Sequence, residues 1–88
     1  MRFNELTPAE IIKCEKLVDA GFDRPASRVL AKELTDDQLS KATRLRRSSI
    51  IDWFAVKVAK EFTDKQIDTM IKLKENGLRV KQAYEKSL

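Results

Sequence analysis

The sequence carries the same short phrase three times at one fixed interval. It reads LTPAEI at residues 6–11, LTDDQL at 34–39 and FTDKQI at 62–67. In each copy a threonine is followed three residues later by Glu or Gln, and an apolar residue flanks each side. This is the pattern of a capping box inside a hydrophobic staple, which marks the first turn of a helix. The phrase therefore predicts helices that begin after Thr7, Thr35 and Thr63.

Each phrase opens a unit that reads as two helices. In the first unit a helix is predicted over about 8–20, with Gly21 as its stop, and a second over about 24–33. In the third unit Gly77 stops the first helix, and the last helix is predicted over about 78–87. Glycine just beyond a helix favours a left-handed cap, so both glycines indicate a sharp reversal of the chain.

The middle unit differs at this reversal, because Ser49 stands where the other two copies have glycine. We predict a break here, with Ser48 or Ser49 capping a fourth helix that runs to about Glu61. The alternative is one continuous helix through both serines, since serine interrupts a helix less firmly than glycine.

The predicted fold is therefore an all-α domain over residues 1–88, with six helices in three stacked hairpins. The repeats cover 5–32, 33–60 and 61–88. Each hairpin has an apolar stripe that it cannot bury alone, so neighbours must stack. Phe3 is expected to pack against the first helices. The aligned core positions are Ile11, Leu39 and Ile67, and Leu17, Leu45 and Leu73.

The predicted fourth helix is the most apolar segment of the chain. It contains Trp53 and Phe54, and as part of the middle hairpin it should be covered from both sides. Both rings are therefore expected in the core. If six short helices cannot cover this segment, one ring remains outside and marks a docking face for a partner protein. The same face could join two copies in a homodimer.

The composition argues against several classes of function. The chain has no His and only one Cys, and Cys14 falls on an apolar stripe where it is expected as a core residue. No Gly-rich phosphate loop or Cys/His cluster is present, so we expect no enzymatic activity, metal or cofactor. No apolar run approaches the length that crosses a bilayer, and no secretory start is seen. These features, with the lone Cys, predict a soluble cytoplasmic protein without membrane partners.

A net charge of +4 permits binding to nucleic acid or to an acidic protein surface. The spacing of cations in the third and fourth helices predicts one basic face that could neutralise phosphates. The competing interpretation is that the arginines complement the end of their helix and solvate a surface. The candidate nucleic-acid-binding residues are Lys41, Arg44, Arg46, Arg47, Lys57 and Lys60.

The third unit resembles the first two helices of resolvase- and transposase-type helix-turn-helix domains. The resemblance rests on FTDKQI at 62–67, IKLKENGL at 71–78 and Ala83, and the first unit is similar. It implies DNA binding with a third helix in the major groove. The sequence departs from that pattern after the first unit, where Asp36 and Asp37 open the helix in the recognition position and would repel phosphates. After the third unit no further helix follows.

Taken together, these features favour a non-enzymatic binding or regulatory module that engages nucleic acid through the basic helical face. The alternative is a protein-binding adaptor or inhibitor, for instance of a nucleic-acid-handling enzyme. Such a protein would bind an acidic surface of its partner through the same cations, or an apolar surface of its partner through Trp53 and Phe54.

Overall fold

The computed structural model describes residues 6–88, and every regular element in this range is a helix. The prediction of an all-α fold is confirmed. The placement of Phe3 lies outside the described residues. The six helices are α1 (Pro8–Ala20), α2 (Arg24–Glu33), α3 (Asp36–Arg47), α4 (Asp52–Glu61), α5 (Asp64–Glu75) and α6 (Val80–Lys86).

The three capping boxes form as predicted. In α1 the Glu10 amide donates to the Thr7 hydroxyl oxygen at 3.2 Å, and the Thr7 amide donates to the Glu10 carboxylate at 2.9 Å. The same reciprocal pair of hydrogen bonds opens α3 at Thr35 and α5 at Thr63. Each box satisfies two backbone donors that a helix start would otherwise leave without partners. The start of every hairpin is thus set by residues three positions apart.

The first helix of every hairpin ends in the same way. Gly21 and Gly77 have φ angles of 117° and 102°, and Ser49 at the matched position has a φ of 67°. The next amide then reaches back to a carbonyl five residues earlier, as from Ile50 to Leu45 at 3.3 Å. This is the bonding pattern of a left-handed helix cap, which satisfies the last carbonyls. The predicted break between the third and fourth helices is confirmed.

The predicted serine cap of the fourth helix is wrong. Both serines belong to the end of α3, and the N-cap of α4 is Ile51, which makes no side-chain capping bond. Because Ser49 takes the left-handed turn, Ile50 is carried into the core and is fully buried. The last helix also begins two residues later than predicted, at Val80.

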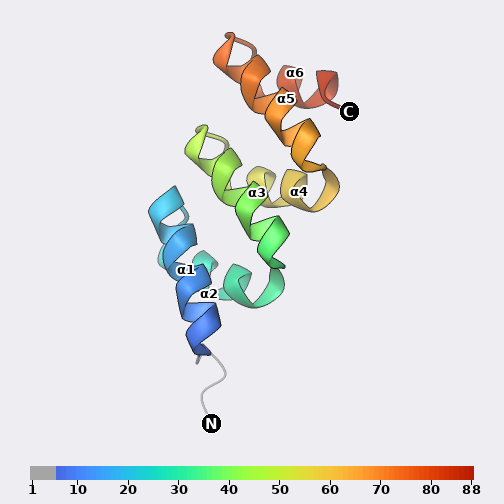
Figure 1. Ribbon diagram of the computed structural model, residues 1–88. Helices are drawn as coiled ribbons and strands as arrows, with labels where there is room; N and C mark the ends of the chain where they lie inside the picture. Colours follow the sequence, from blue (N-terminus) through green and yellow to red (C-terminus); the bar gives the residue numbers. More distant parts are fainter. Residues whose placement is uncertain (1–5) are drawn as a thin grey trace.

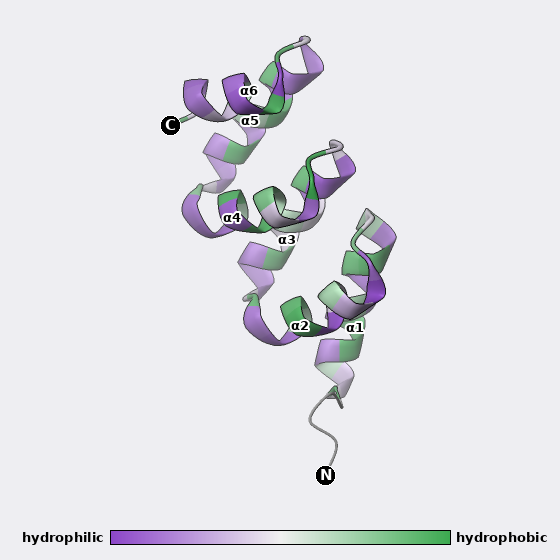
Figure 2. Cartoon of the chain, turned by 180° about the vertical axis from the view of Figure 1, so that it is seen from behind, coloured by the Kyte–Doolittle hydropathy of each residue, from purple (hydrophilic) through white to green (hydrophobic). Residues whose placement is uncertain are grey.

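The three hairpins stack into an elongated array of 47 × 20 × 15 Å. Within each hairpin the two helices pack on each other, and α3 also contacts both α1 and α5. Figure 1 shows α1, α3 and α5 following one another along one side of the array, with α2, α4 and α6 on the other. In Figure 2, seen from behind, the second row faces the reader. The prediction of three stacked hairpins is confirmed.

One hydrophobic core runs through all three hairpins. Leu17 and Leu45 at matched positions are fully buried, whereas Leu73 is only partly buried in the last hairpin. Leu39 and Ile67 are also buried, but Ile11 at the matched position of α1 is 46% exposed, so its predicted place in the core is wrong. The core continues to Ala83 in α6. Cys14 is buried as predicted and is a free thiol. Neighbouring hairpins therefore complete each other's core, as the repeat predicts.

The prediction that α4 is covered from both sides is wrong. Ala55, Val58 and Ala59 are buried, but Ile51 and Trp53 are 60% and 66% exposed. The buried residues form one side of the helix, which packs on α3. The apolar residues at the start of α4 therefore reach the surface of the second row.

Candidate partner-binding surface

The structure removes Lys41 from the predicted basic face. Its side chain is buried, and its ammonium group donates to the carbonyl of Phe62 at 2.7 Å and pairs with Asp37 at 2.9 Å. Phe62 is the residue that ends α4, so the lysine caps the C-terminus of that helix. Lys13, at the matched position of the first hairpin, donates in the same way to the carbonyl of Leu34 at 3.0 Å. The predicted exposure of Lys41 is therefore wrong, because the helix end needs its charge.

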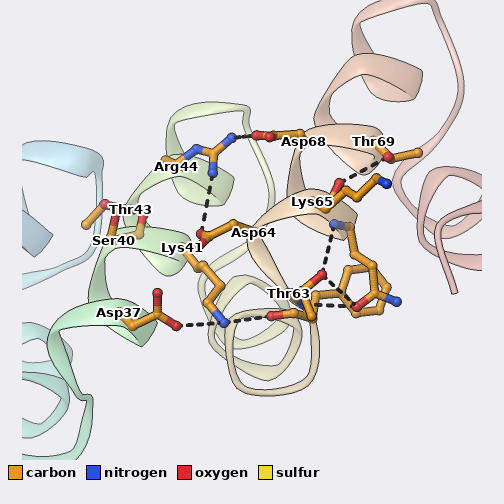
Figure 3. Close-up of polar contacts among 12 residues, drawn as sticks. Asp37, Ser40, Lys41, Thr43, Arg44, Thr63, Asp64, Lys65, Asp68 and Thr69 are labelled. Carbon is orange, nitrogen blue, oxygen red and sulfur yellow. Dashed lines mark hydrogen bonds and ion pairs between the residues drawn. The ribbon is translucent and has the colours of Figure 1, made fainter.

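Two of the predicted arginines are engaged in ion pairs within the chain. Arg44 lies between Asp64 and Asp68 of α5, and so links the second and third hairpins (Figure 3). Arg46 pairs with Asp52 at 2.5 Å, which joins the end of α3 to the start of α4. Both guanidinium groups are thus partly neutralised by neighbouring carboxylates.

Lys57 is also paired, because it donates to Glu61 at 3.0 Å and lies 5.4 Å from the centre of the Tyr84 ring. The hydrogen bond from Lys57, with a smaller contribution from the Tyr84 hydroxyl, lowers the pKa of Glu61 below its usual 4.5. The same bond raises the pKa of Lys57. Among the six predicted cations, only Arg47 and Lys60 have no ion-pair partner in the described part of the chain.

The two aromatic residues of α4 separate in the structure. Trp53 is exposed, and its ring meets Phe54 edge-on with 5.4 Å between centroids. Phe54 is partly buried, and its ring contacts that of Tyr84 in α6 with 5.2 Å between centroids. The Tyr84 ring stacks on Phe62 with 5.1 Å between centroids. These contacts form an aromatic chain that leads from the surface into the core, and they hold Trp53 in place from one side.

Trp53 stands between two apolar grooves on the second row of helices. The first groove, of about 450 Å³, lies between α2 and α4. The second, of about 550 Å³, lies between α4 and α6. We call the surface made by both grooves the tryptophan face. Its apolar lining residues are Phe22, Ala26, Val29, Leu30, Ile51, Trp53, Phe54, Val56, Val80, Tyr84 and Leu88.

Several residues that line the tryptophan face were not predicted to be exposed, although a comparison of the three repeats indicates their exposure. Trp53 aligns with Pro25 in the first hairpin and Lys81 in the third, and Val29 aligns with Lys57 and Glu85. A position that is charged in a sister repeat is generally a solvent-exposed position. Trp53 and Val29 are therefore apolar residues at surface positions, and they are 66% and 56% exposed.

The charge beside the tryptophan face is positive. The helices α2, α4 and α6 together carry seven Lys or Arg against four Asp or Glu, although two of the cations, Lys32 and Lys57, are paired with Glu10 and Glu61. Glu85, at the edge of the second groove, is an exposed carboxylate. The exposed cations on these helices are Arg24, Arg28, Lys32, Lys57, Lys60, Lys81 and Lys86.

A third groove, between α1 and α3, has a different character. It has a volume of about 500 Å³ and is lined by Lys13, Lys16 and Arg47 together with Asp36, which pairs with Lys13 at 3.5 Å. This groove brings together cations from two hairpins that the sequence analysis did not connect. Six of its nine lining residues are polar or charged, unlike those of the tryptophan face.

Over residues 6–88, no group of three or more His, Cys, Asp or Glu is arranged to hold a metal ion. None of the helices described is both long and apolar enough to cross a bilayer. Compared with protein-family models, curated proteins and solved structures, the chain matches none.

Proposed function

We propose that this protein is a binding module whose tryptophan face holds an amphipathic, acidic helix of a partner protein. The observation that carries the proposal is Trp53, a large apolar ring that is 66% exposed between two apolar grooves. A large exposed apolar group costs solubility, and tryptophan is among the commonest anchors of protein interfaces.

The form of the grooves supports a helical partner. An amphipathic helix places apolar side chains at i, i+3 or i+4 and i+7 along one side, and such a row fits an apolar groove. The two grooves lie on opposite sides of Trp53, so a bound helix that fills either one would contact the indole ring. The aromatic chain behind Trp53 limits its motion in the free protein, which reduces the entropy lost on binding.

The charge around the grooves supports an acidic partner. Arg24 and Arg28 lie beside Val29, which lines the first groove, and the second groove is lined by Lys81 together with Glu85. Carboxylates on the partner would be attracted to these cations, which favours association and orientation. Nucleic acid is less well supported, because Lys41 is buried and Arg44, Arg46 and Lys57 are paired within the chain.

The proposal can be tested by selecting helical peptides from a displayed library against the protein. The library varies the side chains on a fixed amphipathic helix, with acidic, neutral and basic members in equal number. We expect enrichment of acidic peptides that carry an apolar stripe. Trp53 is the only tryptophan, so a selected peptide should shift its fluorescence to shorter wavelength and protect it from a soluble quencher.

The matched variants are Trp53→Lys and Ile12→Ser. Lysine already occupies the position of Trp53 in the third hairpin, so the first change should preserve the fold and abolish peptide binding. Ile12 on α1 is similarly exposed but lies outside the tryptophan face, and its variant should bind normally. Peptides that bind Trp53→Lys equally well would refute the proposal. Oligonucleotide binding that is lost in Arg47→Glu with Lys60→Glu would support nucleic acid instead.

A further inference from the structure

The groove between α1 and α3 differs in charge from the matched junction of the next two hairpins. Its lining contains three cations, Lys13, Lys16 and Arg47, against one carboxylate, Asp36, around a volume of about 500 Å³. The matched positions of α3 and α5 carry two cations against four carboxylates, which are Lys41, Arg44, Asp37, Asp64, Asp68 and Glu75. Two junctions of the same architecture therefore have opposite charge.

The α3–α5 junction shows how a cation at one of these positions is neutralised. Arg44 lies between the carboxylates of Asp64 and Asp68 of the next hairpin (Figure 3). Lys16 is the counterpart of Arg44 in α1, and Ser40 is the counterpart of Asp68 in α3. The groove between α1 and α3 therefore has a hydroxyl group where the next junction has a carboxylate.

Two cations of the groove are left without a partner. Asp36, the carboxylate of its lining, pairs with Lys13 at 3.5 Å. Among the residues that the structure describes, neither Lys16 nor Arg47 forms an ion pair. Both side chains are exposed. An anion that enters the groove would thus meet two positive charges that no carboxylate of the described chain neutralises.

We infer that this groove binds a small organic phosphate, in which a phosphomonoester is joined to an apolar group. A phosphomonoester carries a charge of about −1.5 to −2 at pH 7, which matches the two unpaired cations. Its oxygens can accept hydrogen bonds from Lys16, Arg47 and the Ser40 hydroxyl. Ile12 and Leu39 in the same lining offer apolar contact to the organic group. The volume of the groove lies within the range of about 300–1,000 Å³ that is typical of small-molecule sites.

Titration of the isotope-labelled full chain with phenyl phosphate, followed by amide NMR, tests the site. We expect saturable shifts that are concentrated in α1 and α3, with a Kd of about 1 mM or tighter. Inorganic phosphate should bind about fivefold or more weakly because it lacks the apolar group, and phenol should cause no such shifts because it lacks the charge. An absence of shifts with phenyl phosphate, or equal affinity for inorganic phosphate, would overturn the inference.

The double variant Ser40→Asp with Arg47→Glu gives this groove the residues of the next junction. Asp68 and Glu75 already occupy the matched positions of α5, so the variant should remain folded, which circular dichroism checks. We expect it to bind phenyl phosphate about tenfold or more weakly, because one carboxylate now neutralises Lys16 and the other repels the ligand. Affinity equal to that of the wild type would contradict the proposed site.

Control variants separate this groove from the rest of the surface. Lys60→Glu on α4 makes the same change of net charge as Arg47→Glu and should bind phenyl phosphate normally. Trp53→Lys should also bind it normally, because the tryptophan face lies on the second row of helices. Ile12→Ser should weaken phenyl phosphate about threefold and leave inorganic phosphate unchanged. Equal losses in Lys60→Glu and Arg47→Glu would overturn the inference, as would binding seen only with an oligonucleotide or a phosphoserine peptide.

Discussion

At the scale of single residues, several charged side chains of this protein stabilise contacts between its own helices. Lys41 illustrates this, because its position in a basic sequence suggests a surface charge while its ammonium group binds the carbonyl of Phe62. The equivalent Lys13 makes the equivalent bond to Leu34. A buried cation that satisfies a helix end contributes more to stability than an exposed one, since the carbonyl would otherwise lose its partner.

Replacing Lys41 with Met keeps most of the aliphatic stem and removes the charge. We expect the free energy of unfolding to fall by about 1.5–3 kcal/mol, as for hydrogen bonds that involve a charged group. The control is Lys60→Met on the exposed side of α4, which should change stability by less than about 0.5 kcal/mol. Urea denaturation followed by circular dichroism measures both, and equal losses in the two variants would contradict this role of Lys41.

The capping residue of α1 makes part of the stability pH-dependent. The backbone hydrogen bond from Thr7, with further contributions from Lys32, lowers the pKa of Glu10 below its usual 4.5. A lowered pKa in the folded state means that this stabilisation is present above about pH 4.5 and is lost as the pH falls further. Lys57 has the opposite sign, so its contribution is lost only as the pH rises above its usual 10.5.

Glu10→Gln should therefore flatten the acid side of the stability profile. Glutamine can keep the capping bond, as Gln38 and Gln66 do in the other two hairpins. We expect the melting temperature of the variant to fall less than that of the wild type between about pH 5 and pH 3. Thermal melts at a series of pH values test this, and parallel profiles would show that Glu10 does not contribute.

At the scale of the element, the chain reversal after the first helix of each hairpin has the same backbone conformation in all three copies, although the residue and its surroundings differ. Gly21, Ser49 and Gly77 share a positive φ angle, which costs a residue with a Cβ atom about 1 kcal/mol. A Cβ atom on Gly21 would also lie 3.3 Å from the guanidinium carbon of Arg46, whereas nothing lies within 4 Å of the same position on Gly77. The middle hairpin alone bears the conformational cost.

Three substitutions at this position should consequently rank in a definite order. Ser49→Gly should stabilise the fold by about 0.5–1 kcal/mol, because it relieves the left-handed strain. Gly77→Ala should destabilise by about 1 kcal/mol, and Gly21→Ala by more, because Arg46 must also move. Calorimetry on the three variants measures the order. Equal effects for the two glycine variants would show that the contact with Arg46 is unimportant.

At the scale of the whole molecule, stability is shared between neighbours in a linear stack. Only α3 of the first row contacts helices on both sides, so the middle hairpin couples the two outer ones. The ion pairs of Arg44 with α5 add a polar link to this packing. In such an array each hairpin is stabilised by its immediate neighbours. A substitution in the middle hairpin should therefore destabilise both outer hairpins, whereas one in an outer hairpin should mainly destabilise that hairpin.

Leu17→Ala and Leu45→Ala make the same chemical change at matched, fully buried positions. Each should cost about 2–5 kcal/mol locally. We expect Leu17→Ala to lower hydrogen-exchange protection mainly in α1 and α2, and Leu45→Ala to lower it in all three hairpins. Uniform loss of protection in both variants would instead indicate one fully cooperative unit.

The positions of the helices were predictable because the signals for them are local. A threonine cap acts over three residues, and a left-handed reversal acts over five, so each is readable from a short stretch of sequence. At Ser49 the break was predicted but the left-handed turn was not, because the serines were interpreted as the cap of the fourth helix. The start of α4 was mispredicted because Ile51 occupies a cap position without any capping side chain.

The sequence by itself determined the repeat, the three capped helix starts and most of the aligned core positions, but not the starts of α4 and α6 or the exposure of Ile11. Tertiary structure alone decided that Lys41 is buried, that Arg44 is paired with α5 and that Trp53 is exposed between two grooves. The burial of Lys41 depends on how α3 packs on α4 within one hairpin, and the other two outcomes depend on how one hairpin is placed against the next. Residues that meet across this junction are 20 or more positions apart, and periodicity along the chain does not encode the distance between their side chains.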